Sequence, residues 1–445
     1  MEKKGSSRTG IIVSMGLALF ASLFGAGNLI FPPFLGMGSG KDWITGFLGF
    51  FIMDAGMAAF TVFAVVGNRK STINGVMGKV GNIPGKIMMI LVILCIGPGI
   101  GIPRTAVTSY ELGISTLFPG LPQWAFGAIF FALTFFLVIR PNKVVDIVGN
   151  FLTPALLIVM ALLIVTGITH PISDPVQIQQ AAAFKAGVQN GYQTMDGMAA
   201  VMLVLMLITA ANAHGITSKK EIKWMVAGAD VIACILLGII YGGLTYLGAM
   251  VSGDSNFQKL EQAPLLISIT NTLLGKYGVL ALSIIVFLAC LTTAIGLVTV
   301  AGTYFEDVSN GKLKYRYVVI AVILISYAMS NFGLSTIIGI AAPILSILYP
   351  PIIVLIICTV FENVIKNDRA TAVTAYVSLA ISLVETLKIP VLSDLVASLP
   401  LASYGLSWLL PAVVVLLASR LLLGRSDDYR LEVPEDDTLE AVQGN

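Results

Sequence analysis

The sequence has little charge. Only 11% of its 445 residues are Asp, Glu, Lys or Arg, against about 25% in ordinary soluble domains. Hydrophobic residues make up 57% of the chain, and the mean hydropathy is +0.92. This composition excludes a soluble globular protein. It indicates an integral membrane protein with lipid around it.

Residue types that build disulfide frameworks and metal centres are also scarce. The four cysteines and two histidines stand apart from one another, at Cys95, Cys234, Cys290, Cys358, His170 and His214. Single cysteines in apolar runs predict neither disulfides nor a metal knuckle. The net charge is only +2, and the basic residues lie between apolar segments. We therefore expect no organic cofactor, no metal cluster and no nucleic-acid partner.

The apolar runs are long enough to cross a bilayer many times. About twelve runs could span roughly 30 Å of hydrocarbon. The first is longer than the core of a signal peptide and is not followed by an A-x-A cleavage site, so we expect it to stay in the membrane. The predicted spans lie near 10–34, 43–66, 86–109, 123–139, 144–168, 186–211, 224–250, 277–304, 315–331, 335–361, 371–387 and 402–423.

Lysine and arginine predict the orientation of these spans. With the N-terminus inside, 20 of the 26 Lys and Arg residues fall in cytoplasmic segments. This bias is the one expected of a multi-pass protein. It predicts a cytoplasmic N-terminus at 1–9 and an acidic cytoplasmic tail at 424–445.

The first span is interrupted near the expected midplane. Gly25-Ala26-Gly27-Asn28 lies there, and Pro32-Pro33 follows where the helix should still be crossing. An unpaired peptide group in hydrocarbon costs several kcal/mol, so unwound backbone survives only inside protein or beside a wet cavity. The stretch predicts a discontinuous helix whose free peptide groups hold a substrate and a cation.

Span six carries a second interruption, because Gly187, Asn190, Gly191, Asp196 and Gly197 are poor helix formers. Five spans change sides of the membrane, so a second copy of the unit must run upside down. We predict an all-α polytopic protein with a 5+5 inverted repeat, discontinuous helices 1 and 6, and two accessory helices. The repeats would cover 10–168 and 186–361, and the accessory helices 371–423.

Span eight adds two hydroxyl groups, Thr292 and Thr293, in an otherwise apolar run. Hard cations such as Na⁺ take oxygen ligands, so these hydroxyls could join the carbonyls of the first break in one cation site. The alternative is that each threonine bonds back to a carbonyl one turn earlier in its own helix.

Four motifs resemble one family. FGAGNLIFPP at 24–33, GPGIGIPRTA at 97–106, GYQTMDGMAA at 191–200 and LTTAIGL at 291–297 look like those of the branched-chain amino acid transport system II carriers. These are the bacterial branched-chain amino acid:cation symporters, which have a LeuT-type fold. The resemblance implies import of leucine, isoleucine and valine across the bacterial plasma membrane. The coupling ion would be Na⁺, or H⁺ in some members, and membrane lipid would surround the protein.

The wider superfamily implies roles for single residues. Carbonyls and hydroxyls would bind the cation, at Ala21, Phe24, Ala289, Thr292 and Thr293. Backbone amides near the first break would meet the substrate carboxylate, at Gly25, Ala26 and Gly27.

Asn28 would contact a ligand, orient the break or pair freed backbone. Span six would contribute a tyrosine lid and its neighbours, with one leucine from span eight against the aliphatic side chain: Tyr192, Gln193, Met195, Met198 and Leu297. Plain packing is the alternative for these apolar and aromatic positions.

Charged residues in the spans have competing interpretations. Asp196 would cap the restarting half of span six, which we favour, or take part in cation or proton coupling. Arg104 would pair with Glu111 or Asp196, or attract the substrate carboxylate; pairing is favoured because an unpaired buried charge is costly. By the same resemblance, Arg8 and Asp307 would form a cytoplasmic gate.

Other functions fit less well. A proton-coupled importer of another small neutral amino acid remains an alternative. An intramembrane enzyme would need a catalytic set such as Ser/His/Asp or HExxH, which the sequence lacks. A passive channel would not need paired threonines opposite a broken helix, and a receptor would normally carry a larger soluble domain.

Overall fold

The computed structural model describes residues 8–67, 73–139, 143–178, 182–213, 215–216 and 218–423. Every regular element in these ranges is a helix. The first half of the chain contains α1 (Arg8–Leu23), α2 (Ala26–Ser39), η1 (Gly40–Asp42), α3 (Trp43–Phe51), η2 (Ile52–Gly56), α4 (Met57–Gly67), α5 (Ile73–Met77), η3 (Gly78–Val80), α6 (Asn82–Leu94), η4 (Cys95–Gly99), α7 (Gly101–Ser109), η5 (Tyr110–Ile114), α8 (Ser115–Leu117), α9 (Gln123–Ile139) and α10 (Lys143–Thr169).

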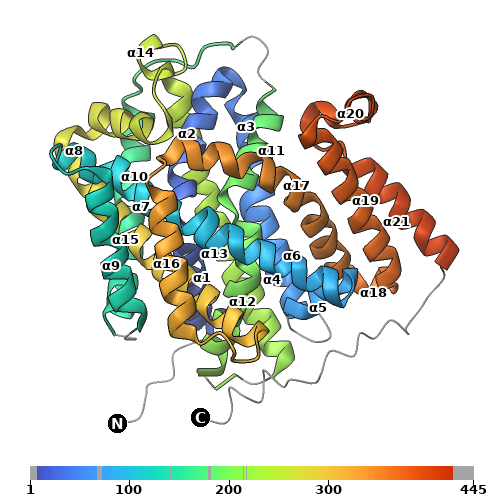
Figure 1. The fold of residues 1–445 in the computed structure, drawn as a ribbon. Helices are drawn as coiled ribbons and strands as arrows, with labels where there is room; N and C mark the ends of the chain where they lie inside the picture. The colour runs from blue at the N-terminus through green and yellow to red at the C-terminus, as the bar shows by residue number, and fades with distance from the viewer. Residues whose placement is uncertain are drawn as a thin grey trace.

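The second half continues the helical bundle (Figure 1). It contains α11 (Ala183–Thr194), α12 (Asp196–Ala213), α13 (Lys219–Met250), α14 (Ser255–Gln258), α15 (Gln262–Val308), α16 (Tyr315–Ser330), α17 (Leu334–Val360), α18 (Glu362–Ile365), α19 (Asp368–Leu387), α20 (Leu392–Ala397), η6 (Ala402–Tyr404) and α21 (Leu409–Leu423).

Membrane-spanning character is clear from length and composition. In the described part of the chain, six helices are long and apolar enough to cross a membrane, and the bent pair α11 and α12 makes a seventh. Five shorter apolar helices accompany them. The protein is therefore a multi-pass membrane protein. The limits of α9 and α16 agree with the predicted spans 123–139 and 315–331.

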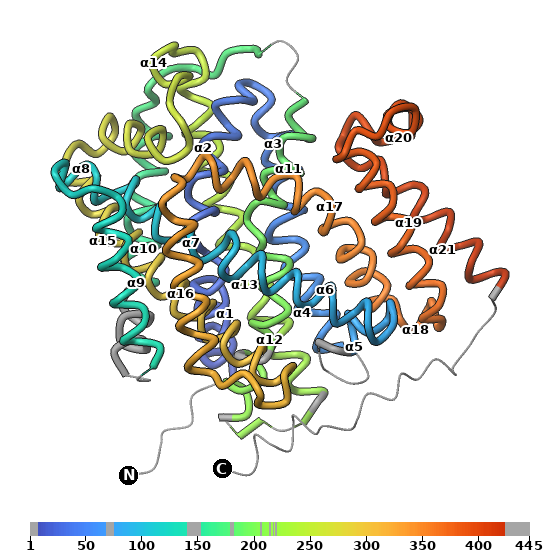
Figure 2. The backbone as a smooth tube through the Cα atoms, in the orientation of Figure 1, coloured from blue at the N-terminus to red at the C-terminus, as the bar shows by residue number. Residues whose placement is uncertain are grey.

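Interrupted helices and the helices that hold them form the centre of the molecule (Figure 2). α13 packs against α1 and α2, while α11 packs against α3 and α12 against α4. Facing glycines allow α2 and α13 to approach closely. A Cβ atom on Gly36 would lie 1.8 Å from the Thr245 carbonyl oxygen, and one on Gly248 would lie 1.8 Å from the Pro33 carbonyl oxygen. Small residues permit such contacts between membrane helices.

Both breaks are narrower than the sequence predicted. Pro32 and Pro33 lie inside α2, because this helix is buried against α13 and keeps its helical path despite the missing N–H groups. Gly187 and Gly191 are likewise helical. A Cβ on Gly187 would lie 2.1 Å from the Gly46 carbonyl oxygen. The span-six glycines thus serve close packing against the neighbouring helix, while the interruption of this span lies at Met195.

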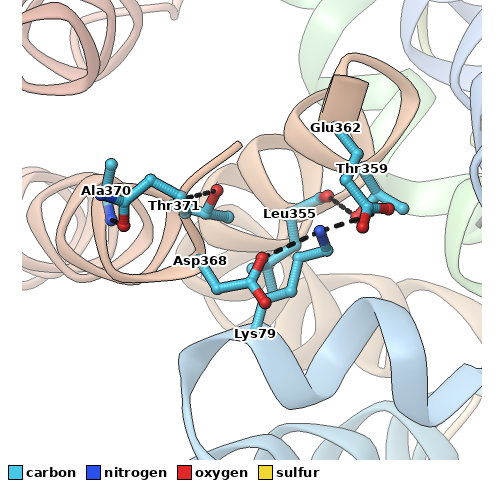
Figure 3. A network of polar contacts seen from close by, with 8 residues as sticks. Lys79, Leu355, Thr359, Glu362, Asp368, Ala370 and Thr371 are labelled. Atoms are coloured by element: carbon cyan, nitrogen blue, oxygen red, sulfur yellow. Dashed lines mark hydrogen bonds and ion pairs between the residues drawn. The ribbon is translucent and has the colours of Figure 1, made fainter. Parts of the chain in front are cut away.

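The C-terminal helices stand at one side of the bundle (Figure 1). α19 packs against both α17 and α21. Lys79 ties η3 to the start of α19, since its Nζ lies 3.1 Å from Asp368 Oδ1 and 3.6 Å from Glu362 Oε2 (Figure 3). The Tyr376 hydroxyl donates to the Val80 carbonyl oxygen at 2.6 Å. The Tyr376 bond attaches the segment 371–423, predicted as accessory, to the first half of the chain, and Lys79 holds the residues just before this segment.

Candidate functional site

Two helix breaks supply the backbone of the site. α1 ends at Leu23 and α2 begins at Ala26, with Gly25 extended between them at φ −106° and ψ −168°. α11 ends at Thr194 and α12 begins at Asp196. Met195 between these helices is left-handed, with φ 67°. Each break leaves amides and carbonyls without partners in their own helix.

A small cavity lies between the breaks. Its volume is about 50 Å³. Five predicted substrate residues line it, together with Thr293, Arg104 and Asp196: Gly25, Ala26, Asn28, Met195 and Leu297. The other lining residues are Ser22, Leu23, Ile96, Gly101, Thr105, Thr194 and Ala199.

Asn28 joins the two interrupted spans. Its Nδ2 donates to Asp196 Oδ2 at 2.7 Å and also to the Tyr241 hydroxyl oxygen. Asn28 is only 1% exposed. Of its predicted roles, orienting the breaks is the one that these bonds support. Asp196 lies in the first turn of α12, as a cap would, but the bond that the structure gives its carboxylate comes from α2.

Arg104 binds the end of α11. Its guanidinium donates to the carbonyl oxygens of Gln193 and Thr194, the latter at 3.2 Å. It also lies over the Phe31 ring, 5.7 Å from the centroid. Among the described residues, no carboxylate lies within ion-pair distance of this arginine. The favoured pairing with Glu111 or Asp196 is therefore not formed as a direct ion pair in this structure, where the guanidinium donates to the free carbonyls of the break.

Asp54 is a site residue that was not predicted. It lies in η2, a π-helical turn between α3 and α4, and it is fully buried. The Thr194 hydroxyl donates to its Oδ1 at 2.7 Å. The only sign of Asp54 in the sequence was a single carboxylate in an apolar run, and its spacing did not indicate a contact with span six. Tyr241 also stands alone in an apolar run, and its contact with Asn28 was not predicted either.

Several predicted substrate residues lie away from the cavity wall. Tyr192 stacks on Tyr349 with ring centroids 4.6 Å apart, so in this structure the predicted lid packs against α17. Met198 is fully buried. A Cβ on Gly27 would meet the Arg104 guanidinium at 3.1 Å, and Gln193 contributes its carbonyl to the same group. These residues do not line the cavity. Tyr192 and Met198 are packed inside the protein, and Gly27 and Gln193 contact Arg104.

Cation-ligand predictions have a mixed outcome. The Thr292 hydroxyl donates to the carbonyls of Leu288 and Ala289 at 3.1 and 3.0 Å, as the alternative interpretation expected. Thr293 instead lines the cavity, and its Cγ2 lies 4.0 Å from the Cβ position of Gly25. The structure thus brings span eight beside the first break. The ligand set of Ala21, Phe24, Ala289, Thr292 and Thr293 stays a prediction.

Arg8, one half of the predicted cytoplasmic gate, forms an ion pair with a residue other than Asp307. Arg8 donates to Glu221 Oε1 on α13 at 2.9 Å. Asp307 lies in the last turn of α15, and its pairing with Arg8 stays a prediction. Both groups of the Arg8 pair are largely exposed, and such an ion pair contributes only about 0 to 1 kcal/mol.

A larger cavity, of about 240 Å³, lies apart from these residues. Its lining comes from the ends of α3 and α11 and from η6: Asp42, Thr45, Ala182, Ala183, Phe184, Lys185, Ser403 and Tyr404. None of the predicted site residues lines it, so we place the candidate site at the smaller cavity between the breaks.

Comparison with known proteins now decides the family. The family model for branched-chain amino acid transport proteins matches residues 8–424. This chain belongs to that family. The branched-chain amino acid permease BraB of Bacillus subtilis is 34% identical over 90% of this chain and 93% of its own. The permease BrnQ of Escherichia coli K12 is 33% identical over 91% and 94%, respectively.

Membership in the branched-chain amino acid transport family confirms the resemblance seen in the four motifs. The relatives are named permeases and carriers, which confirms the expectation of a transporter rather than an enzyme. Solved structures share the fold at low identity. MhsT in complex with L-phenylalanine matches with a TM-score of 0.54 and 17% identity, over 95% of this chain and 99% of that one. The inward-facing conformation of Mhp1 matches with a TM-score of 0.58 and 11% identity, over 92% and 91%.

Proposed function

We propose that this protein imports leucine, isoleucine and valine by cation symport, with Na⁺ as the favoured ion. The carrier would work by alternating access, with two inverted five-span repeats moving around the paired breaks and about twelve spans in all. Both termini would face the cytoplasm of a bacterial cell. The family supports the substrate class, since its named members are branched-chain amino acid permeases.

One observation carries the proposal: two interrupted helices meet at a cavity that both polar and apolar residues line. Gly25 and Ala26 offer free amides at the start of α2, where the positive end of the helix dipole favours a carboxylate. Met195 and Leu297 line the same cavity and offer apolar surface for an aliphatic side chain. Arg104 and Asp196 each bond to protein groups, which suits a zwitterion better than an acidic or basic amino acid.

Contacts between the interrupted helices and their neighbours support the repeat. α1 and α2 pack on α13, and α11 and α12 pack on α3 and α4. α1 and α2 form span one and α13 forms span seven, while α11 and α12 form span six and α3 and α4 form span two. An inverted repeat predicts that span one contacts span seven in the way that span six contacts span two.

Uptake of labelled leucine into proteoliposomes tests the proposal. Under an inward Na⁺ gradient, the wild-type protein should accumulate leucine, and Thr293→Val should lower the initial rate about tenfold, as expected for a lost ligand worth about 1.4 kcal/mol. The matched control is Thr299→Val, because Thr299 lies on the same helix and bonds back to the Ile295 carbonyl at 2.8 Å. Uptake that ignores the Na⁺ gradient, or a Thr293 variant as active as the control, would reject Na⁺ symport through this site.

A further inference from the structure

Lys79 is the one buried lysine among the residues whose burial the structure describes, and its side chain is 5% exposed. A buried ammonium group is costly unless carboxylates pair with it. Two carboxylates do so here (Figure 3). Lys79 Nζ donates to Asp368 Oδ1 at 3.1 Å and lies 3.6 Å from Glu362 Oε2. The cluster therefore joins one cation to two anions that come from other parts of the chain.

The three residues belong to different units of the proposed architecture. Lys79 lies in η3, in the loop between predicted spans two and three, and thus within the first repeat. Glu362 directly follows the second repeat, and Asp368 begins α19, the first accessory helix. The distribution of Lys and Arg predicts that both loops are cytoplasmic. Lys79 therefore connects the two repeats and the accessory helix at one side of the membrane.

The attachment of η3 to α19 has a second contact. The Tyr376 hydroxyl donates to the Val80 carbonyl oxygen at 2.6 Å, about two helical turns along α19 from Asp368. Asn367 caps α19, because its side-chain oxygen accepts from the Ala370 amide at 3.1 Å. This cap fixes the first turn, in which Asp368 lies. The loop of the first repeat is thus held to the accessory helix at two points.

The contact between Lys79 and Glu362 is the weaker one. At 3.6 Å it is an ion pair, but it is longer than an N–H···O hydrogen bond of about 2.7–3.2 Å. The Glu362 side chain is 25% exposed, so water can solvate its carboxylate when the pair separates. Lys79 keeps Asp368 as a partner in that case. The geometry therefore allows one contact of the lysine to break while the other persists.

We propose that Lys79 is a positioning residue for transport, which stays bonded to Asp368 and releases Glu362 when the protein opens to the cytoplasm. The pair with Glu362 favours the state closed on that side, because it holds the cytoplasmic ends of the two repeats together. This inference rests on the proposed transport function. It gives the accessory helix α19 a part in the cycle, which is to hold the loop of the first repeat in place.

Cys358 is a native reporter of this contact. It lies in the last turn of α17, four residues before Glu362, and it is 2% exposed. In purified protein, Glu362→Gln should raise its rate of reaction with a maleimide several-fold, because the released end of α17 is open more often. Cys95 and Cys290, which are also buried, should react at the wild-type rate. Lys366→Gln is the matched control, since it removes an exposed charge from the same loop.

Leucine uptake into proteoliposomes gives a second readout. A smaller population closed to the cytoplasm lowers the apparent affinity for outside leucine by the same factor. Glu362→Gln should therefore raise the KM several-fold without lowering the unfolding temperature, and Lys366→Gln should change neither. Asp368→Asn should lower the unfolding temperature, because it detaches η3 from α19. Lys79→Met should show both effects, and Lys79→Arg should recover most of the loss, since arginine also pairs with carboxylates.

Peptide mass spectrometry of the labelled cysteines decides the inference. It is overturned if Glu362→Gln leaves Cys358 as unreactive as in the control. It is also overturned if Cys95 and Cys290 become reactive to the same degree, which would indicate a general loosening of the bundle. A wild-type protein that takes up no leucine would reject the proposed function, whereas the labelling of Cys358 needs no leucine and would still show whether this contact opens.

Discussion

Arg104 replaces the hydrogen bonds that the last turn of α11 lacks. A helix end leaves carbonyls without partners, and in this protein the guanidinium reaches two of them, on Gln193 and Thr194. The ring of Phe31 covers the same group. One side chain of α7 therefore stabilises the break in span six and contacts the helix that follows the break in span one.

Arg104→Met should destabilise the protein and weaken transport. Two buried carbonyls would lose their donor, at a cost of about 1–3 kcal/mol each. Arg104→Lys should recover part of the loss, because an ammonium group can donate but cannot imitate the planar fork. Thermal unfolding in detergent measures the effect. Arg316→Met, at an exposed position, is the control. An Arg104→Met protein as stable as the control would show that the break does not need this arginine.

The sequence motifs predicted several residues that line the cavity, whereas residues that folding brings there from distant parts of the chain were not predicted. Gly25, Asn28 and Thr293 stood in recognisable motifs and do line the cavity. Asp54 and Tyr241 stand alone in apolar runs, and only the packing of α3, α4 and α13 against the breaks brings them to the site. The partner of Arg104 was missed because backbone carbonyls become available only once the exact end of α11 is known.

At the scale of helices, glycine decides how closely the central elements approach. Gly36 and Gly248 let α2 and α13 meet backbone to backbone, with no space for a Cβ on either glycine. The sequence showed where the glycines are but not what they do. Their number in spans one and six indicated interrupted helices, whereas most of them lie within helices and allow close packing against a neighbouring helix. The apolar pattern predicted the position of helices such as α9 and α16 well, because a bilayer sets their length.

Gly248→Ala should disturb this contact. Its Cβ would lie 1.8 Å from the Pro33 carbonyl oxygen, so α2 must shift, and overpacking of this kind typically costs about 1–3 kcal/mol. The matched control is Gly339→Ala on α17, where a Cβ would meet nothing within 4 Å. We expect the unfolding temperature in detergent to fall for the first variant only. Equal stability of the two proteins would contradict the close approach of α2 and α13.

At the scale of the whole molecule, the question is which loops face the cytoplasm and which face outside. The loop between α15 and α16 and the loop between α16 and α17 lie at opposite ends of α16. The distribution of Lys and Arg predicts that the first loop is cytoplasmic and the second external. The described cysteines suit labelling experiments, since Cys95, Cys290 and Cys358 are buried and Cys234 is half-buried.

Single cysteines introduced into these loops measure the orientation. Lys312→Cys should react with a membrane-impermeant maleimide only after the cells are opened, while Phe332→Cys should react in intact cells; both positions are exposed. The unsubstituted protein gives the background. The reverse labelling pattern would invert the predicted topology, and labelling of both positions from outside would contradict the assignment of α16 as a span.

The amide of Asn28 has a mechanical consequence. It is attached to one interrupted span and hydrogen-bonded to the other, so the two cannot move separately without leaving a buried amide and a buried carboxylate unpaired. A penalty of about 1–3 kcal/mol makes independent motion rarer than concerted motion by about 5-fold to 150-fold. In the proposed transport cycle, the same bond would therefore also limit slippage, in which an ion crosses without its amino acid.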